Sequence, residues 1–287
     1  MRLLASFLFV SSLCHFVVAK PQVYFIAPAS GDCTLQNGTT LTPCYTLQQL
    51  NSILQSAEER QVMFTMLPGT HTLTQLLVSN FSQVVIRPWI QEEEVHIQCL
   101  SKSHGGQNFE FQGVFELNLS SLHFITCSLH CDMNSELARS INIEACIFER
   151  SEREDDISDS DFLTVIAKPL QNITISNCKF LSGGSVEIFN QNWDPFNQDT
   201  NTFATVHIAG TLCEGNEYND DDFDYALETK NTMLVITNSQ FIGNGGGVSP
   251  ESSFMTIENT TFSNNNSSNS GSAIDLNYSG IHMFGYP

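Results

Sequence analysis

Two runs of carboxylates are the residues of this chain whose types and spacing could support chemistry. One run includes Asp155 and Asp156 within residues 149–161, and the other lies within residues 214–228. The second run supplies the calcium candidates Asp220, Asp221, Asp222 and Asp224. Flexible, oxygen-rich segments suit Ca²⁺, although neither the glycine nor the closing glutamate of an EF-hand loop is present. Because runs of like charge are more often solvated faces, we expect solvated spacers; an unchanged melting temperature in millimolar calcium would exclude the calcium site.

A cluster of histidines and cysteines has the composition of a zinc site. His123, Cys127, His130 and Cys131 lie within nine residues, and four such ligands can hold zinc. In a strand, however, successive side chains point to opposite faces, and an oxidising compartment favours disulfides over thiolate ligands. We therefore expect these cysteines to form disulfides or to pack in the core, without a metal.

The number and positions of the nine cysteines indicate disulfides. Eight remain if Cys14 leaves with a cleaved leader, and an even number is typical of paired cysteines in a secreted chain. Cys33 and Cys44 are the most plausible pair, because both lie in a segment rich in Gly, Asn, Thr and Pro. Cys146 and Cys178 occupy equivalent positions of a repeat, where stacked neighbours about 4.8 Å apart could bridge or pack as small apolar groups.

Eight asparagines lie in acceptor sequences for N-linked glycans, which fits a secreted surface protein. The glycosylation candidates are Asn37, Asn80, Asn259, Asn265 and Asn277. The other three are Asn266 and two residues in or beside expected strands, Asn118 and Asn172.

The first 19 residues have the pattern of a secretory signal peptide. Arg2 provides the positive charge, Leu3–Leu13 is an apolar run too short to span a membrane, and Val17–Ala19 precedes the expected cleavage site. No later segment offers about 18 consecutive apolar residues, so we expect a secreted chain that begins near Lys20 and has no membrane span. The alternative is an uncleaved N-terminal anchor.

The secreted chain is strongly acidic. Loss of Arg2 leaves 10 basic and 31 acidic side chains, a formal net charge of −21. Such a chain repels nucleic acid and anionic lipid, so we expect neither as a partner.

The elements that must position these residues are built from a phrase that recurs six times. Two apolar residues are separated by one residue, and a third apolar residue, usually a large one, follows five positions after the second. The copies are Leu117–Phe124, Ile141–Phe148, Ile173–Phe180, Val206–Cys213, Leu234–Phe241 and Met255–Phe262. Their ends are 24, 32, 33, 28 and 21 residues apart. A constant phrase with variable intervals is typical of a solenoid in which stacked strands are joined by loops of different length.

The aligned copies share a turn three residues before their ends. The residues there are Ser121, Ala145, Asn177, Gly210, Asn238 and Asn259. All are small or asparagine, types that tolerate a left-handed backbone. Stacked coils would bring Asn238 and Asn259 together, approaching an asparagine ladder, whereas the Gly210 coil separates Asn177 from Asn238.

A further turn follows the phrase. Three residues after its end stand Asn216, Asn244 and Asn265. Glycine-rich runs come next, at 183–188, 245–248 and 271–276. Because glycine permits a sharp bend, we expect each run to open another strand. One coil is therefore a strand, an asparagine turn, a strand with phenylalanine, a glycine-rich turn and a third strand.

Residues 20–60 differ from the repeats. Residues 21–28 form an expected strand, which is followed by the Cys33–Cys44 loop. Residues 45–60 have apolar residues at a helical period, at Leu47, Leu50, Ile53, Leu54 and Ala57. Thr42 followed by Pro43 is a reasonable helix start, so we predict the one convincing helix of the chain here.

The phrase and its following residues resemble a known repeat. FxxN followed by GGA[ILV] is the signature of polymorphic outer-membrane-protein-type β-helices, and this chain has FIGNGGGV at Phe241–Val248 and, loosely, FSNN…GSAI at Phe262–Ile274. The N-terminal part, with Cys33…PCYTL and FTMLPGTHTL, resembles secreted or membrane-anchored animal β-helix proteins that are abundant in sponges and cnidarians. Together the two resemblances cover most of residues 22–278.

The resemblance implies an all-β, right-handed parallel β-helix of the pectin-lyase-like type. Residues 1–19 would be the signal peptide, residues 20–60 an N-terminal part whose helix caps the first coil, and residues 61–287 the coils. The chain stops just after a repeat without a further cap or anchor, which would fit a fragment of a longer, membrane-anchored protein.

Enzymes of this fold class that cleave sugars carry motifs that we do not find. NTD, GHG and RIK motifs are missing, and Lys179 is the only Lys or Arg inside a phrase. Since a fold does not imply a function, we predict a non-enzymatic extracellular protein that binds a glycan or a protein, with no required cofactor. The alternative is a polysaccharide lyase or glycoside hydrolase that depends on Asp156 or Asp221. A third possibility is a partial gene product with no independent role.

Overall fold

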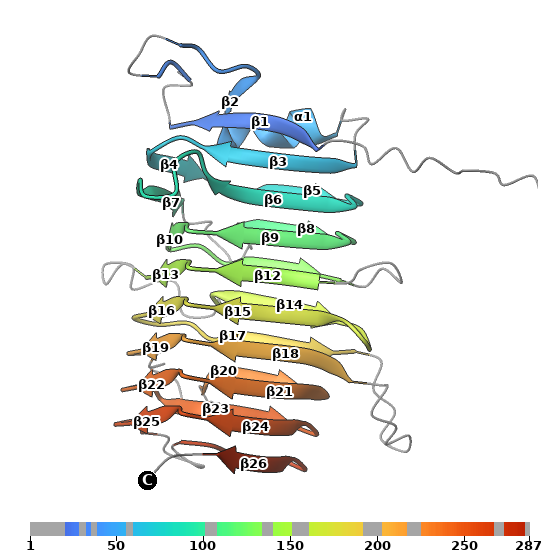
Figure 1. Ribbon diagram of the computed structural model, residues 1–287, viewed down its shortest axis with the longest axis vertical. Helices are drawn as coiled ribbons and strands as arrows, with labels where there is room; N and C mark the ends of the chain where they lie inside the picture. The colour runs from blue at the N-terminus through green and yellow to red at the C-terminus, as the bar shows by residue number, and fades with distance from the viewer. Residues whose placement is uncertain are drawn as a thin grey trace, which may run out of the picture.

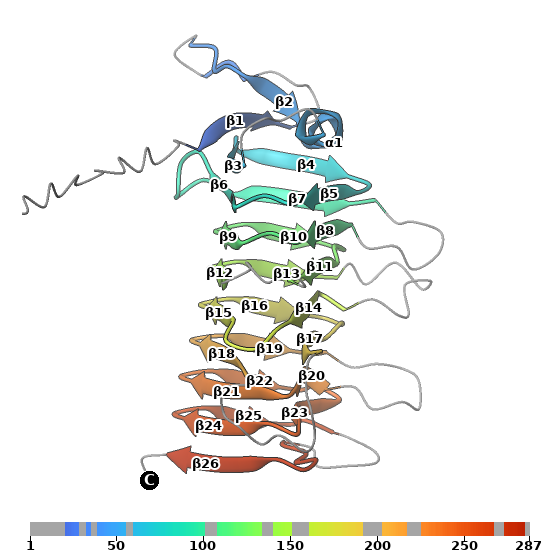
Figure 2. The same cartoon turned by 90° about the vertical axis from the view of Figure 1, so that its right-hand side faces the viewer.

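The strands of this protein form three sheets that the chain visits in turn. The computed structural model describes residues 21–28, 33–35, 39–55, 60–100, 108–133, 140–150, 161–191, 203–216, 225–266 and 273–284. Neighbouring strands within each sheet are parallel, and from β3 (Gln61–Met66) to β25 (Thr261–Ser263) every third strand returns to the same sheet. Figures 1 and 2 show the coils stacked along the long axis of the molecule. The predicted all-β parallel β-helix is therefore confirmed.

Each sheet is ordered along this axis. The first sheet consists, in spatial order, of β2 (Cys44–Thr46), β1 (Gln22–Ala27), β3 (Gln61–Met66), β6 (Gln83–Pro88), β9 (Glu116–Ser120), β12 (Ser140–Glu144), β15 (Asn172–Ser176), β18 (Ala204–Ala209), β21 (Thr232–Thr237), β24 (Phe254–Glu258) and β26 (Gly280–Phe284). The second sheet consists of β4 (Gly69–Leu73), β7 (Val95–Cys99), β10 (His123–Ile125), β13 (Ile147–Glu149), β16 (Lys179–Leu181), β19 (Leu212–Glu214), β22 (Gln240–Ile242) and β25 (Thr261–Ser263). The third sheet consists of β5 (Leu76–Ser79), β8 (Phe109–Gln112), β11 (Leu129–Asp132), β14 (Leu163–Ala167), β17 (Val186–Asn190), β20 (Tyr225–Lys230) and β23 (Gly246–Glu251).

The repeated phrase forms one strand of the first sheet and the next strand of the second. Its two leading apolar residues point inward, as Leu117 and Leu119 do on β9, and its last residue is buried on the second sheet, as Phe124 is on β10. Between them the backbone is left-handed in all six copies, with φ between 48° and 58°. This explains the small residues and asparagines at that position, because other side chains clash there. A Cβ at Gly210 would lie 2.7 Å from Oδ1 of Asn177, so any other residue here would require the Asn177 side chain to move.

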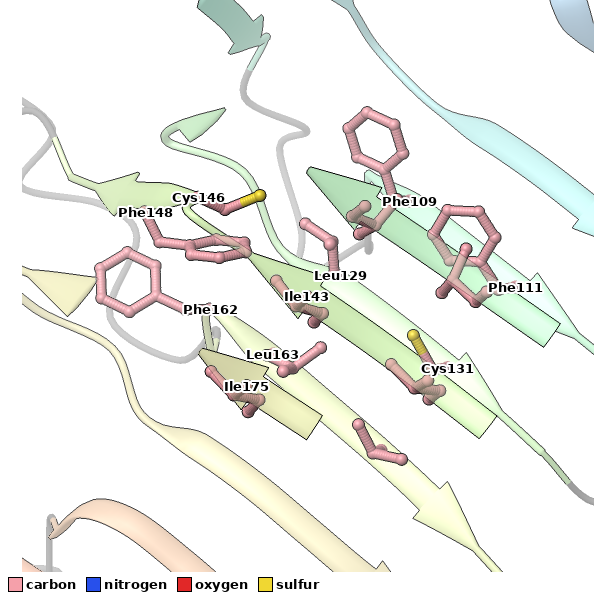
Figure 3. Close-up of a cluster of buried hydrophobic side chains, with 14 of the residues drawn as sticks. Phe109, Phe111, Leu129, Cys131, Ile143, Cys146, Phe148, Phe162, Leu163 and Ile175 are labelled. Atoms are coloured by element: carbon pink, nitrogen blue, oxygen red, sulfur yellow. The ribbon is translucent and has the colours of Figure 1, made fainter. Parts of the chain in front are cut away.

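The core is a continuous column of aliphatic and aromatic side chains (Figure 3). Phe148 stacks between Phe124 and Phe180, with ring centroids 4.9 and 4.8 Å away and ring planes within 10° of parallel. Phe241 and Phe262 repeat this arrangement at 5.0 Å. Cys213 occupies the equivalent position between Phe180 and Phe241. In-register parallel pairing brings identical residues face to face, which is why the column is aromatic along most of its length.

A well-formed asparagine ladder lies at the turn after the phrase. Nδ2 of Asn244 donates to Oδ1 of Asn265 at 3.0 Å and to the Cys213 carbonyl at 3.1 Å, while Oδ1 of Asn244 accepts from the Asn216 backbone at 3.1 Å. The ladder predicted at the first turn is weaker. Its only side-chain contact between described residues joins Asn259 and Asn238 at 3.5 Å in an exposed position.

A short helical segment caps the first coil. It comprises the 3₁₀ helix η1 (Leu47–Gln49) and α1 (Leu50–Leu54), and its apolar residues join the main core. The side chain of Asn51 bonds to Gln75 and to the backbone N–H of Leu77 beside the edge of the third sheet, at 2.8 and 2.9 Å. The helix is shorter than the predicted 45–60: it begins at Leu47 rather than near Thr42 and Pro43, because Tyr45 and Thr46 pair with β1 as part of β2, and it ends at Leu54.

Two disulfides join described cysteines. The predicted Cys33–Cys44 bridge is present, and a second joins Cys99 to Cys127. Among the residues described, the buried cysteines without a bridge are Cys131, Cys146, Cys178 and Cys213. Disulfides indicate an oxidising environment.

Two of the three glycine-rich runs open full strands, β17 and β23, as predicted. The third, at 271–276, contributes only the isolated bridge of Ile274 to Val248 among its described residues. The described part of the chain contains no helix long and apolar enough to cross a membrane.

Candidate functional site

The acidic candidates lie outside the described residues. This holds for Asp155 and Asp156, for Asp220–Asp222 and for Asp224. The flanks of these runs belong to the scaffold, since Glu149 and Glu214 end strands and β20 begins at Tyr225. The calcium and hydrolase interpretations therefore remain predictions from the sequence.

The glycosylation candidates differ in their surroundings. Exposed positions are held by Asn80, Asn259 and Asn277. Asn265 is half-buried in the ladder, and its Nδ2, the atom that a glycan would occupy, donates to the Phe241 carbonyl at 3.0 Å. Asn37 lies outside the described residues. Glycan occupancy at all five stays a prediction.

The proposed zinc ligands are separated, as strand alternation predicts. Cys127 is bridged to Cys99, and Cys131 is buried on β11. His123 faces outward on β10, where Nε2 lies 2.9 Å from Oε2 of Glu149 and the ring lies 4.9 Å from that of His96. No group of three or more potential metal ligands with suitable geometry occurs among the described residues.

One region of the first sheet is free of charged side chains, and sequence analysis did not single it out. The outward-facing residues of β15, β18 and β21 are Asn172, Thr174, Ser176, Thr205, His207, Ala209, Met233, Val235 and Thr237. None is Asp, Glu, Lys or Arg, in a chain whose net charge is −20. We call these nine residues the uncharged face. By contrast, the third sheet presents Glu110, Asp132, Glu187, Glu228, Lys230 and Glu251.

The uncharged face is regular because its three strands pair in register. Thr174 lies beside His207, and His207 lies beside Val235. The same central row continues to Asn142 on β12 and Thr256 on β24. Parallel strands are about 4.8 Å apart, so equivalent side chains repeat at this interval along the axis. The broad arrows of these strands lie side by side in Figure 1.

The polar groups of this face are available to a ligand. The side chains of Asn172, Thr174, Ser176, Thr205, His207 and Thr237 have no hydrogen-bond partner among the described residues. Water satisfies exposed groups of this kind, and a ligand can replace that water at little cost. The signal in the sequence was the lack of charge at the positions that alternate with the inward apolar residues of these strands.

The face shares its lack of charge with the centres of protein interfaces, which are depleted of charged residues. Acid, base and nucleophile chemistry needs titratable groups in mutual contact, and His207 is the only such side chain among the nine.

Comparison of the whole chain with protein-family models gives no match, and comparison with curated proteins gives none.

Proposed function

We propose that this protein is a non-enzymatic extracellular β-helix that binds a glycan or a protein through the uncharged face. The observation that carries the proposal is the lack of charge on three neighbouring strands of a chain with 31 acidic and 11 basic residues. Hydroxyl, amide and imidazole groups there can bond to neutral polar groups of either ligand class. A secreted location, expected from the first 19 residues, accords with the two disulfides.

The resemblance of the repeats to polymorphic outer-membrane-protein-type β-helices and to animal β-helix proteins supports an exported binding scaffold. A solenoid of this kind offers long, flat faces on which equivalent side chains repeat. A glycan polymer or an extended protein segment can meet several equivalent groups at once, so weak contacts add up to useful affinity.

The experiment compares two variants that add the same charge in exposed positions. His207→Glu alters the centre of the uncharged face, whereas Gln240→Glu alters the second sheet. The secreted protein and both variants would be screened on a glycan array and against purified extracellular proteins. We expect a ligand whose affinity falls about tenfold for His207→Glu, a loss of about 1.4 kcal/mol, and stays unchanged for Gln240→Glu. No ligand in either screen, or equal losses in both variants, would contradict the proposal.

A further inference from the structure

We infer that the partner is a protein whose docking surface combines positive charge with apolar side chains, and that it docks on an apolar corner at the edge of the uncharged face. The apolar corner consists of Leu170, Met233 and Phe254, with Phe203 beneath them. The inference rests on the proposed function, because Met233 belongs to the face itself.

The four residues form a connected group across neighbouring coils. The N–H of Leu170 donates to the Phe203 carbonyl at 3.0 Å. The rings of Phe203 and Phe254 meet edge to face, with centroids 5.5 Å apart. Phe254 is the in-register neighbour of Met233. Leu170 and Phe203 lie just before β15 and β18, while Met233 and Phe254 lie at the start of β21 and β24; these starts are the right-hand ends of the strands in Figure 1.

Three of the four are unusually exposed for large apolar residues. The exposed fractions are 72% for Leu170, 54% for Phe254 and 40% for Met233. Phe203, by contrast, is buried beneath Phe254. A contiguous exposed group of this kind marks an interaction surface more often than a single exposed residue does.

Leu170 is held in solvent by a strained and well-anchored turn. Its φ is 64°, a left-handed conformation that is unfavourable for a large side chain. The next residue, Gln171, is buried, and its side chain bonds to the Lys168 N–H at 2.8 Å and the Met133 carbonyl at 3.1 Å. An Asn or Gly would suit this backbone better, so the fold does not require the leucine, whereas contact with a partner would account for it.

The charge of the molecule restricts the partner. Two copies, each with a net charge of −20, repel one another, whereas a basic protein is attracted over long range. The C–H face of a sugar can stack on the ring of Phe254, but a protein also supplies apolar side chains that pack around Leu170 and Met233. Aromatic residues and methionine are enriched at protein interfaces. A basic, apolar protein surface satisfies both requirements.

The test uses synthetic peptides of defined composition on the full secreted chain. Three peptide sets combine Leu and Phe with Lys, Leu and Phe with Glu, or Ser and Thr with Lys. Leu170→Asn and Phe254→Thr remove parts of the apolar corner. Leu77→Thr is the matched control, since Leu77 is an exposed leucine (41%) on the third sheet.

We expect the apolar basic peptides to bind best, with affinity reduced about tenfold by Leu170→Asn or Phe254→Thr and unchanged by Leu77→Thr. Leu170→Asn should keep or raise the melting temperature, which separates lost binding from lost folding. Equal binding of the Ser/Thr basic peptides would show attraction by charge alone and overturn the inference. Dimerisation that depends on Leu170 would overturn it too. A glycan ligand whose binding is sensitive only to His207→Glu would overturn the inference of a protein partner and leave the proposed function intact. If nothing binds in any of these experiments, both the inference and the proposed function are wrong.

Discussion

Cysteine, serine and threonine occupy one equivalent position in successive coils, two residues before the end of the phrase. The Sγ atoms of Cys146 and Cys178 donate to the carbonyls two residues earlier, at 3.4 and 3.3 Å. The hydroxyls of Thr211, Ser239 and Thr260 make the same bond at 3.2, 2.9 and 3.0 Å. Burial raises the pKa of the Cys178 thiol to about 12, so this thiol is not reactive near neutral pH. Cys146 and Cys178 are therefore structural substitutes for a hydroxyl residue.

Replacing Cys146 or Cys178 by serine should cost little stability, whereas replacing Cys213 by serine should cost more. We expect Cys146→Ser and Cys178→Ser to change the free energy of unfolding by less than about 1 kcal/mol, because the new hydroxyl has a partner. Cys213→Ser should lower it by about 1–3 kcal/mol, since its sulfur, between Phe180 and Phe241, has no polar partner among the described residues. Urea titration measures all three; equal costs would refute the distinction.

His71 should make the stability of the N-terminal part depend on pH. It is buried beside a cavity of about 90 Å³, with Nε2 bonded to the Leu67 carbonyl at 2.7 Å and Nδ1 without a partner among the described residues. Burial lowers the pKa of His71 from its ordinary value of 6.5, more strongly than the carbonyls of Leu67 and Ala27 raise it. Below pH 6.5 the unfolded chain therefore binds a proton that the folded protein resists.

The stability contributed by neutral His71 should be complete above pH 6.5 and decline as the pH falls below it. The loss should level off once the pH is below the folded pKa. His71→Gln keeps an N–H for the Leu67 carbonyl but cannot titrate in this range. We expect the melting temperature of the wild type to fall more between pH 7 and pH 5 than that of the variant. Parallel curves would show that His71 does not contribute.

At the scale of elements, side chains in the turns between strands stabilise the corners of each coil. The asparagine ladder satisfies backbone groups that the corner between the second and third sheets would otherwise leave unpaired. Asn244 is fully buried and bonds to Cys213, Asn216 and Asn265. Because water cannot reach the backbone groups of a buried corner, these side-chain bonds are needed to satisfy them.

Removing one rung of this ladder should be costly. Asn244→Ala leaves the Asn216 N–H and the Cys213 carbonyl without partners, and we expect a loss of about 2–4 kcal/mol in the free energy of unfolding. Asn142→Ala removes the same amide from an exposed position on β12 and should change it by less than about 0.5 kcal/mol. Denaturant titration of both variants tests the ladder, and similar values would contradict it.

The left-handed turn of the phrase offers a stabilising substitution. Ala145 has a φ of 52°, where alanine is strained and glycine is not. We expect Ala145→Gly to raise the free energy of unfolding by about 1 kcal/mol. Ala209→Gly, at the end of β18, should lower it by about 0.5–1 kcal/mol. Glycine gives the unfolded chain more freedom, and in a strand there is no left-handed strain whose relief would compensate. Thermal melts decide, and a loss at both positions would refute the turn argument.

At the scale of the whole molecule, the acidic charge opposes folding. The one Lys–Glu ion pair found in the described part of the chain joins Lys230 to Glu251 at 2.8 Å. Folding brings the carboxylates of the described strands closer together than in the extended chain, so their mutual repulsion increases.

Screening this repulsion should stabilise the protein. We expect the melting temperature to rise by a few degrees as NaCl increases from about 10 mM to about 200 mM, because the Debye length shortens from about 30 Å to below 10 Å. A melting temperature that falls with added salt would show that attractive pairs dominate, and would refute the argument.

The sequence by itself determined the coil. Strand alternation, the apolar residues of the phrase and the small residues at its turn are local requirements, so they predicted the stacked strands, the strand that carries phenylalanine and the left-handed corners. The Cys33–Cys44 pair was also predictable, because both residues lie in one segment rich in Gly, Asn, Thr and Pro.

Only the tertiary structure decided which distant residues meet. Cys99 and Cys127 belong to different coils, and their pairing depends on the register between β7 and β10. The stronger asparagine ladder lies at the second turn because Asn216, Asn244 and Asn265 align there, while Gly210 interrupts the first. The uncharged face and the apolar corner arise in the same way. Their residues are separated by up to 84 positions, from Leu170 to Phe254, and form one surface only once the coils stack in register.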